Sequence, residues 1–181
     1  MTQVVSADSQ DHRKYDKMSA QIQLKRHMGS FSLSYSTVKS WAERLKLPFR
    51  ASDEAGQIAV HCRLLDSDVP LLFIPRPERD MLTVAVTLPF VVKTERFAAV
   101  TAALSTLNVR SYMGAWILNP ERGEVYFRVT LPTLDTAFSD DALRFVARVV
   151  LSSAEAMAQP LYSIAHEGAS PEIVAKTRSA T

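Results

Sequence analysis

The sequence predicts an α+β fold in which helices pack on an antiparallel five-stranded sheet. Segments with alternating apolar residues come in two runs, and segments with apolar residues at helical spacing stand before, between and after those runs. Because the links between successive strand segments are short, the strands are expected to pair antiparallel. Helices that separate such runs pack on the sheet, which gives the order α-βββ-α-ββ-α.

The predicted domain covers residues 36–168 of the 181-residue chain, a length that suits one domain with its own core. Residues 1–35 are expected to form a polar extension with a weak helical pattern from Tyr15 to Met28. Residues 169–181 are expected to form a frayed tail.

The first helix of this domain is expected to be capped by Ser36 or Thr37, whose hydroxyl satisfies a free amide of the first turn, and to end at Pro48. Its apolar face has the spacing i, i+3, i+4 and i+7 and consists of Val38, Trp41, Ala42 and Leu45. Three strands are expected next, with a turn at Asp66–Asp68 between the first two. They are Ile58–Leu65, Val69–Ile74 and Met81–Leu88.

A second helix is predicted at Thr94–Leu107, with Asn108 as a left-handed residue that ends it. A hairpin is predicted from Met113 to Leu131. Its turn is Asn119–Gly123, in which Pro120 presets one backbone dihedral and Gly123 accepts a positive one.

The closing helix is predicted to begin near Ser139, to be kinked or interrupted at Pro160, and to end at Gly168. Apolar residues surround more than half of its circumference, and one sheet face covers only a narrower stripe. These residues are Leu143, Phe145, Val146, Val149, Val150, Leu151, Met157 and Leu161. We therefore expect a homodimer joined through an edge strand or through the helix Thr94–Leu107. The alternative is a monomer in which the first helix or the N-terminal segment covers the excess apolar surface.

Composition limits the class of protein. The chain carries 21 basic and 19 acidic residues, a balance that gives no indication of nucleic-acid binding. Its single cysteine, Cys62, cannot form an internal disulfide, and no apolar run has the length of a signal peptide or a membrane span. These features favour a cytoplasmic protein that binds neither nucleic acid nor membrane.

No arrangement of residues indicates catalysis, a metal or a cofactor. His61 and Cys62 are neighbours in a predicted strand, so their side chains point to opposite faces and cannot form a nucleophile pair. The remaining histidines lack the spacing of a zinc site, and the isolated glycines form no phosphate-binding loop. We therefore expect no enzyme activity, no catalytic residue, no metal site and no cofactor.

The best candidate for a binding surface is one face of the last strand. Tyr126, Arg128 and Thr130 alternate along it, and Tyr and Arg are enriched among residues that dominate protein–protein binding. The predicted partner-binding residues are Tyr126, Arg128 and Trp116, although a tryptophan at this spacing is more often part of a core.

A Leu107–Asn108 step ends the second predicted helix, a strand of the form Gly-x-aromatic-x-Leu and a glycine turn follow, and the next strand has the form Val-x-aromatic-Arg. The residues concerned are Gly114, Trp116, Leu118, Gly123, Glu124, Val125, Phe127, Arg128 and Leu131. Together with the long closing helix, they resemble the bacterial YbjN family, also called sensory transduction regulators. That family shares the architecture of class I type III secretion chaperones. The resemblance covers about residues 36–168.

The resemblance implies a non-enzymatic protein-binding module, chaperone-like or regulatory, that acts as a homodimer and binds a partner polypeptide. The sequence names neither the partner nor the pathway. Because secretion chaperones are usually shorter and acidic, this longer and slightly basic chain is closer to the YbjN-like proteins. The alternative function is a sensor that binds a small molecule or an anion in a pocket between the sheet and the helices.

Overall fold

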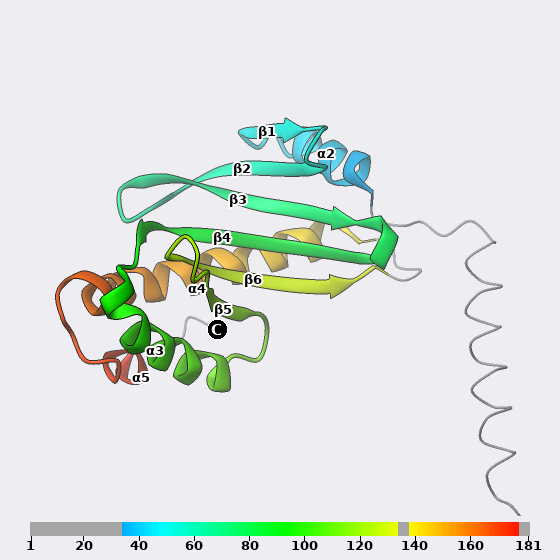
Figure 1. Ribbon diagram of the computed structural model, residues 1–181. Coiled ribbons are helices and arrows are strands. Elements are labelled where there is room, and N and C mark those ends of the chain that lie inside the picture. Colours follow the sequence, from blue (N-terminus) through cyan, green and yellow to red (C-terminus); the bar gives the residue numbers. More distant parts are fainter. Residues whose placement is uncertain (1–33, 134–137, 178–181) are drawn as a thin grey trace, which may run out of the picture.

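The computed structural model describes residues 34–133 and 138–177. In this part of the chain a six-stranded sheet has the order β1-β2-β3-β4-β6-β5, and all neighbouring strands are antiparallel (Figure 1). The strands are β1 (Phe49–Ser52), β2 (Gln57–Leu64), β3 (Ser67–Arg76), β4 (Met81–Val91), β5 (Ala115–Leu118) and β6 (Glu124–Pro132). The predicted α+β class and antiparallel sheet are confirmed, whereas the predicted count of five strands is wrong by one.

The strand that the sequence does not reveal is β1. It has four residues, and its two central residues are both exposed, so it lacks the alternation by which a half-buried strand is recognised. It also follows Pro48 directly and forms the edge of the sheet, paired only with β2. The next turn also differs from the prediction, because Leu65 and Asp66 form a two-residue hairpin turn with positive φ and Ser67 already pairs in β3.

Four helices accompany the sheet in the described residues, together with short 3₁₀ turns at Pro77–Arg79 and Thr94–Arg96. They are α2 (Tyr35–Arg44), α3 (Phe97–Arg110), α4 (Asp140–His166) and α5 (Ile173–Lys176). In Figure 1, α2 and α4 lie behind the sheet, whereas α3 and α5 flank its β5 edge. The core therefore forms between one face of the sheet and the helices.

The start of α2 differs from the prediction. Ser34 is its N-cap, and the Ser34 hydroxyl accepts a hydrogen bond from the Thr37 amide at 3.3 Å. The predicted caps, Ser36 and Thr37, are already within the first turn because Tyr35 continues the helix toward its N-terminus. The helix ends at Arg44, before Pro48. Between these two residues, Lys46 has a left-handed φ of 53°. Residues 1–33 of the predicted extension lie outside the described residues.

The prediction that Asn108 ends the second helix is wrong, because α3 continues to Arg110. The Asn108 side chain instead contacts the main chain of Trp116 twice. Its amide donates to the Trp116 carbonyl oxygen at 3.0 Å, and its carbonyl oxygen accepts from the Trp116 N–H at 2.7 Å. Asn108 thus fixes the distance between α3 and the edge strand β5.

The predicted start of the closing helix is confirmed, since Ser139 is the N-cap of α4. Of the two predicted effects of Pro160, an interruption of the helix is wrong, because α4 runs on to His166, and a kink stays a prediction. The physical reason is packing on both sides of the proline, where one missing hydrogen bond is outweighed by a continuous buried stripe. The buried residues of α4 are Leu143, Val146, Val150, Ala154, Met157, Ala158, Leu161, Ile164 and Ala165.

The prediction of a frayed tail from residue 169 onward is wrong as far as Thr177. It forms α5, in which Val174 is fully buried, and the Arg110 side chain donates a hydrogen bond to the Ala175 carbonyl oxygen at 2.7 Å. A helix of four residues leaves too short a periodic pattern to be recognised from sequence. Residues 178–181 lie outside the described part of the chain.

Candidate functional site

The predicted partner-binding residues lie on opposite faces of the sheet. Tyr126 and Arg128 project from β6 on the face away from α4, where Tyr126 is half-buried and Arg128 is exposed. Trp116 projects from β5 on the covered face and is only 5% exposed, with its ring centroid 5.0 Å from that of Phe127. Trp116 is therefore part of the core, and binding through Tyr126 and Arg128 stays a prediction.

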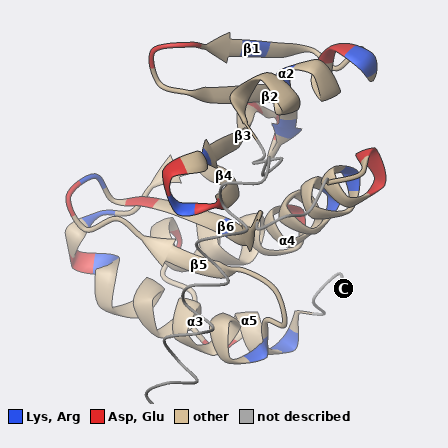
Figure 2. Ribbon diagram, turned by 90° about the vertical axis from the view of Figure 1, so that its right-hand side faces the viewer, with Lys and Arg blue, Asp and Glu red and all other residues tan. Residues whose placement is uncertain are grey.

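The face that carries Tyr126 and Arg128 is covered by no helix of the described residues (Figures 1 and 2). Across it, Arg128 pairs in register with Ala85 on one side and with Ala115 on the other. Tyr126 pairs with Thr87 and Ile117. The surface is thus flat and made of small or half-buried side chains, with few charges at its centre.

A second surface lies on the covered side, where α2 stands apart from α4. It is an open, mainly apolar groove of about 500 Å³. Its floor consists of Val60, Leu71 and Phe73 from β2 and β3, and Trp41 of α2 packs on Phe73 with ring centroids 5.1 Å apart. The lateral walls are Leu45 and Leu47 beside α2 and Arg144, Ala147, Arg148, Leu151, Ser152 and Glu155 on α4.

No sequence pattern predicts this groove. The spacing of Trp41 and Leu45 correctly predicts the apolar face of a helix. It does not show that part of this face stays uncovered. The available signal is the apolar width of the closing helix, where Leu151 extends beyond the stripe that faces the sheet. Those extra apolar residues line a groove instead of filling a core.

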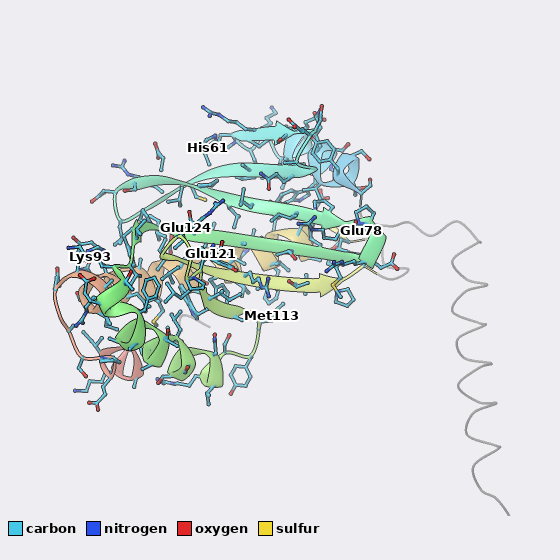
Figure 3. The ribbon with its side chains drawn as sticks, viewed as in Figure 1. His61, Glu78, Lys93, Met113, Glu121 and Glu124 are labelled. Atoms are coloured by element: carbon cyan, nitrogen blue, oxygen red, sulfur yellow. The ribbon has the colours of Figure 1, made fainter. Side chains whose placement is uncertain are left out.

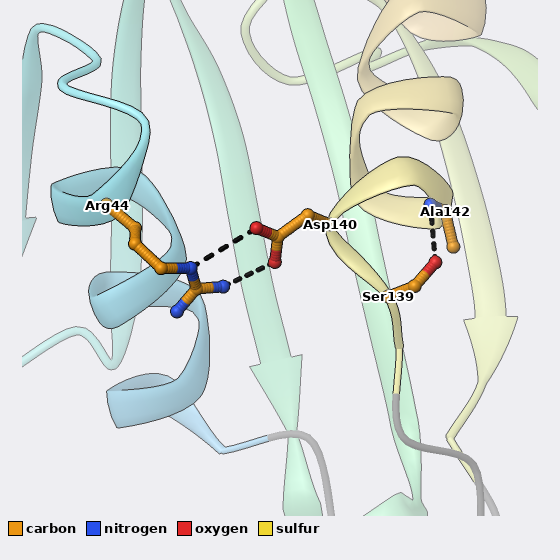
Figure 4. A network of polar contacts seen from close by, with 4 residues as sticks. All are labelled: Arg44, Ser139, Asp140 and Ala142. Atoms are coloured by element: carbon orange, nitrogen blue, oxygen red, sulfur yellow. Dashed lines mark hydrogen bonds and ion pairs between the residues drawn. The ribbon is translucent and has the colours of Figure 1, made fainter.

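An ion pair joins α2 to α4 at one end of the groove (Figure 4). The Arg44 guanidinium donates to both carboxylate oxygens of Asp140, with an Nε–Oδ2 distance of 3.2 Å. Arg44 is in the last turn of α2 and Asp140 in the first turn of α4, so each charge also suits its helix dipole. The hydrogen bond from Arg44 lowers the pKa of Asp140, and the same bond raises the pKa of Arg44.

A second polar contact ties α2 to the hairpin of β1 and β2. The Tyr35 hydroxyl donates a hydrogen bond to the Asp53 carboxylate in the turn between these strands. This bond raises the pKa of Tyr35 to about 12. Both contacts are at the protein surface, so α2 is held against its neighbours by its apolar face and by two exposed polar links.

His61 and Cys62 lie on opposite faces of β2, as predicted from their adjacency. His61 is exposed (Figure 3), whereas Cys62 is half-buried and its thiol lies 3.4 Å from the Val69 carbonyl oxygen. Burial raises the pKa of the Cys62 thiol, which keeps it protonated and poorly nucleophilic near neutral pH. Within residues 34–133 and 138–177 no group of three or more His, Cys, Asp or Glu side chains is placed to hold a metal ion.

A third surface is the outer side of α3. No charged residue occurs between Phe97 and Val109, and Figure 2 shows this helix without charge along most of its length. Val100, Ala103, Leu104 and Leu107 are buried, yet the opposite side is open to solvent. Val109 is 88% exposed and Tyr112, just after the helix, is 97% exposed.

Among the described residues, no helix is both long and apolar enough to cross a bilayer.

Two solved structures share the fold. A chain from the crystal structure of the ExsC–ExsE complex matches with a TM-score of 0.55 and 19% identity, over 72% of this chain and 97% of that chain. The crystal structure of YbjN from E. coli matches with a TM-score of 0.53 and 11% identity, over 77% of this chain and 94% of that chain. These likenesses confirm the type III secretion chaperone-like architecture.

No protein of curated function matches the sequence. The family model of YbjN, described as "Putative bacterial sensory transduction regulator", matches residues 34–162, which is most of the chain and nearly all of the sheet with its helices. The motif residues of the hairpin fall within this match, as the resemblance in sequence implied. The chain belongs to the YbjN family.

Proposed function

We propose that this protein is a non-enzymatic module, chaperone-like or regulatory, that acts as a homodimer and binds a partner polypeptide. The observation that carries the proposal is the open apolar groove between α2 and α4. A small-molecule sensor is expected to enclose its ligand in a cavity with a few convergent polar groups. An open groove that runs along three turns of α4 suits a polypeptide better. The ExsC–ExsE complex is a precedent for this fold in a complex with another protein.

The proposed dimer uses α3. A surface helix normally carries charge on its outer side, and a helix that is uncharged all round is normally buried on both sides. The exposed residues Ala98, Ala102 and Ser105 are small and allow a second helix to approach closely. Because the helix bears no charge from Phe97 to Val109, two copies can meet around a twofold axis without like-charge repulsion. The edge strands fit less well, since β1 is short and Asn108 occupies the outer main-chain groups of Trp116 on β5.

Light scattering coupled to size exclusion tests the dimer. The wild-type chain is expected at twice its 20.1 kDa mass, and Ala102→Glu at the monomer mass because it places two carboxylates against each other. Ser40→Glu, on the exposed side of α2, is the matched control and should leave the dimer intact. A monomeric wild-type chain at high micromolar concentration would contradict this part of the proposal.

Affinity capture from the native host, followed by mass spectrometry, tests partner binding. The expected result is one polypeptide recovered in an amount comparable to the bait, and lost when Leu151→Glu places a charge in the groove. A variant with Arg122→Glu, in the turn between β5 and β6, controls for added negative charge. If no protein co-purifies with the wild-type chain, or if turnover is found with a hydrolase or transferase substrate, the proposed function is wrong.

A further inference from the structure

The floor of the α2–α4 groove restricts the backbone of anything that binds there. It is built from Val60 of β2 and Leu71 and Phe73 of β3, and each of these residues is paired with a strand on both sides, so the floor contains no free strand edge. An extended peptide in the groove would find no main-chain partner there for its amides and carbonyls. Leaving such groups unpaired against an apolar surface costs about 1–3 kcal/mol each. A helix avoids this cost because it satisfies its own main chain.

The dimensions of the groove also suit a helix. Its α4 wall extends from Arg144 to Glu155, twelve residues of helix that span about 16 Å. Ala147 and Leu151 provide the apolar contacts at the centre of this wall, and Leu45 and Leu47 face them from the α2 side. Apolar side chains at spacing i, i+3/i+4 and i+7 on a ligand helix reach over the same three turns.

The charges on the α4 wall determine which amphipathic helices suit the groove. Arg144 and Arg148 are both exposed and follow each other by one turn on α4. Asp140, one turn before Arg144, is already bonded to Arg44, and Asp141 is exposed but does not line the groove. Arg148 makes no hydrogen bond and no ion pair with any residue in the described part of the chain. The wall therefore offers positive charge over its first two turns, with the carboxylate of Glu155 at its far end.

We propose that this groove binds an amphipathic helix of a partner polypeptide, with the apolar stripe of that helix against Leu45 and Leu151 and with acidic residues facing Arg144 and Arg148. The inference rests on the proposed function, because it names the partner chemistry of the same groove. The chain's own amphipathic stretch, Tyr15–Met28, has one acidic residue and three basic ones, Lys17, Lys25 and Arg26, so its charge is of the wrong sign.

Binding is measured on the full chain with the fluorescence of Trp41. The chain has two tryptophans, so Trp116→Phe leaves Trp41 as the only one, and Trp116 is on the opposite half of the sheet. Two synthetic helical peptides serve as probes. Both carry leucines at i, i+3, i+4 and i+7, and one has glutamates beside this stripe where the other has lysines. The glutamate peptide should change the Trp41 emission and bind roughly tenfold more tightly than the lysine peptide at low salt, with the difference falling as salt is added.

Charge reversal in the groove makes the test specific. The Arg144→Glu, Arg148→Glu double variant should reverse the preference between the two peptides, and Arg122→Glu should leave it unchanged. Circular dichroism on each variant shows that the fold is retained. The inference is overturned if neither peptide changes the Trp41 emission, if both bind equally at low salt, or if the preference survives the double reversal.

Different results would contradict the groove inference and the proposed function. If the peptide preference is as expected but the tagged wild-type chain captures no protein, the function is wrong and the groove's chemistry holds. If the wild-type chain and the Arg144→Glu, Arg148→Glu variant capture the same polypeptide equally well, the function holds and the groove inference is wrong.

Discussion

The two halves of the sheet differ in how closely the helices cover them. On the half formed by β4, β6 and β5, the helices α3 and α4 pack directly on the strands and on each other, and α5 packs on both helices. There the ring of Trp116 packs at a tilt on that of Phe127, and Asn108 binds the Trp116 main chain. On the half formed by β1, β2 and β3, α2 and α4 stand apart, leave the apolar groove between them and meet through the exposed Arg44–Asp140 pair.

This difference separates the residues that identify the family from those that suit a function. The motif residues Asn108, Gly114, Trp116, Gly123 and Phe127 all belong to the closely packed half. Each is explained by packing, a turn or a main-chain contact. The groove lies in the other half and carries none of these motif residues, so a match to the family motif confirms the scaffold and leaves the binding chemistry to be read from the structure.

The largest effect on stability is expected at Gly114, in the closely packed half. Gly114 has a φ of 84°, and a Cβ there would lie 2.6 Å from the Arg128 carbonyl oxygen and 2.6 Å from the Phe127 ring. Gly114→Ala should therefore lower the free energy of unfolding by about 2–5 kcal/mol, through backbone strain and overpacking together. Gly56→Ala is the control, because Gly56 has a φ of 59° with nothing within 4 Å of the added Cβ. It should cost about 1 kcal/mol. Chemical denaturation measures both, and equal losses would contradict the contrast between the halves.

A smaller effect is expected at Asn108. Asn108→Ala removes two hydrogen bonds to the Trp116 main chain and should lower the free energy of unfolding by about 1–3 kcal/mol. Asn108→Asp retains the acceptor for the Trp116 N–H but lacks the donor, so its loss should be intermediate. Urea denaturation of the three proteins provides the comparison. If the aspartate variant were less stable than the alanine variant, the contact to the Trp116 N–H would not be the important one.

The same contrast explains what the sequence could predict. Alternation and helical spacing locate four strands and the three longer helices, because each is long enough for its buried face to repeat. The four-residue β5 is located by the turn Asn119–Gly123 that joins it to β6. Short elements held by their neighbours are not recognised, as β1 and α5 show. Tyr126 and Arg128 were placed correctly on an uncovered strand face by alternation alone, whereas Trp116 proved to be a core residue.

The groove could not be predicted, because it depends on the separation of two helices distant in sequence. Periodicity shows that Trp41 and Leu151 belong to apolar helix faces, and it does not show whether those faces meet. Asn108 illustrates the same limit at a single residue. Asparagine is common at the ends of helices. Only the position of β5 shows that this side chain binds the main chain of Trp116 instead.

In the groove half, loss of the Arg44–Asp140 pair should have little effect on stability at neutral pH, because both side chains are exposed. The pKa of Asp140 is lowered in the folded state, so any contribution of the pair is present above the ordinary carboxyl pKa of 3.8 and is lost as the pH falls through the lowered value. The difference in melting temperature between the wild-type chain and Asp140→Asn should therefore be small near neutral pH and should vanish in acid. A large difference at neutral pH would show that the two helices depend on this pair.

The smallest effect is expected at Tyr35, and only in alkali. Its pKa is 10.0 in the unfolded chain and about 12 in the folded one, so the contribution of the Tyr35–Asp53 bond is fully present below pH 10 and is lost as the pH rises toward 12. The stability of the wild-type chain should fall more steeply over this interval than that of Tyr35→Phe. Parallel pH profiles for the two proteins, from denaturation at each pH, would show that the bond does not persist in solution.

The contact between Asn108 and Trp116 has one more consequence. A sheet with a free outer strand is a template for pairing with strands of other molecules, and proteins protect such strands against aggregation. On β5 the outward main-chain groups of Trp116 are occupied by the Asn108 side chain, and at the other edge β1 is only four residues long. A helix residue thus protects the edge of the sheet as a neighbouring strand would. Loss of Asn108 is expected to shorten the time before the protein forms insoluble, sheet-rich assemblies, even under conditions in which most molecules remain folded.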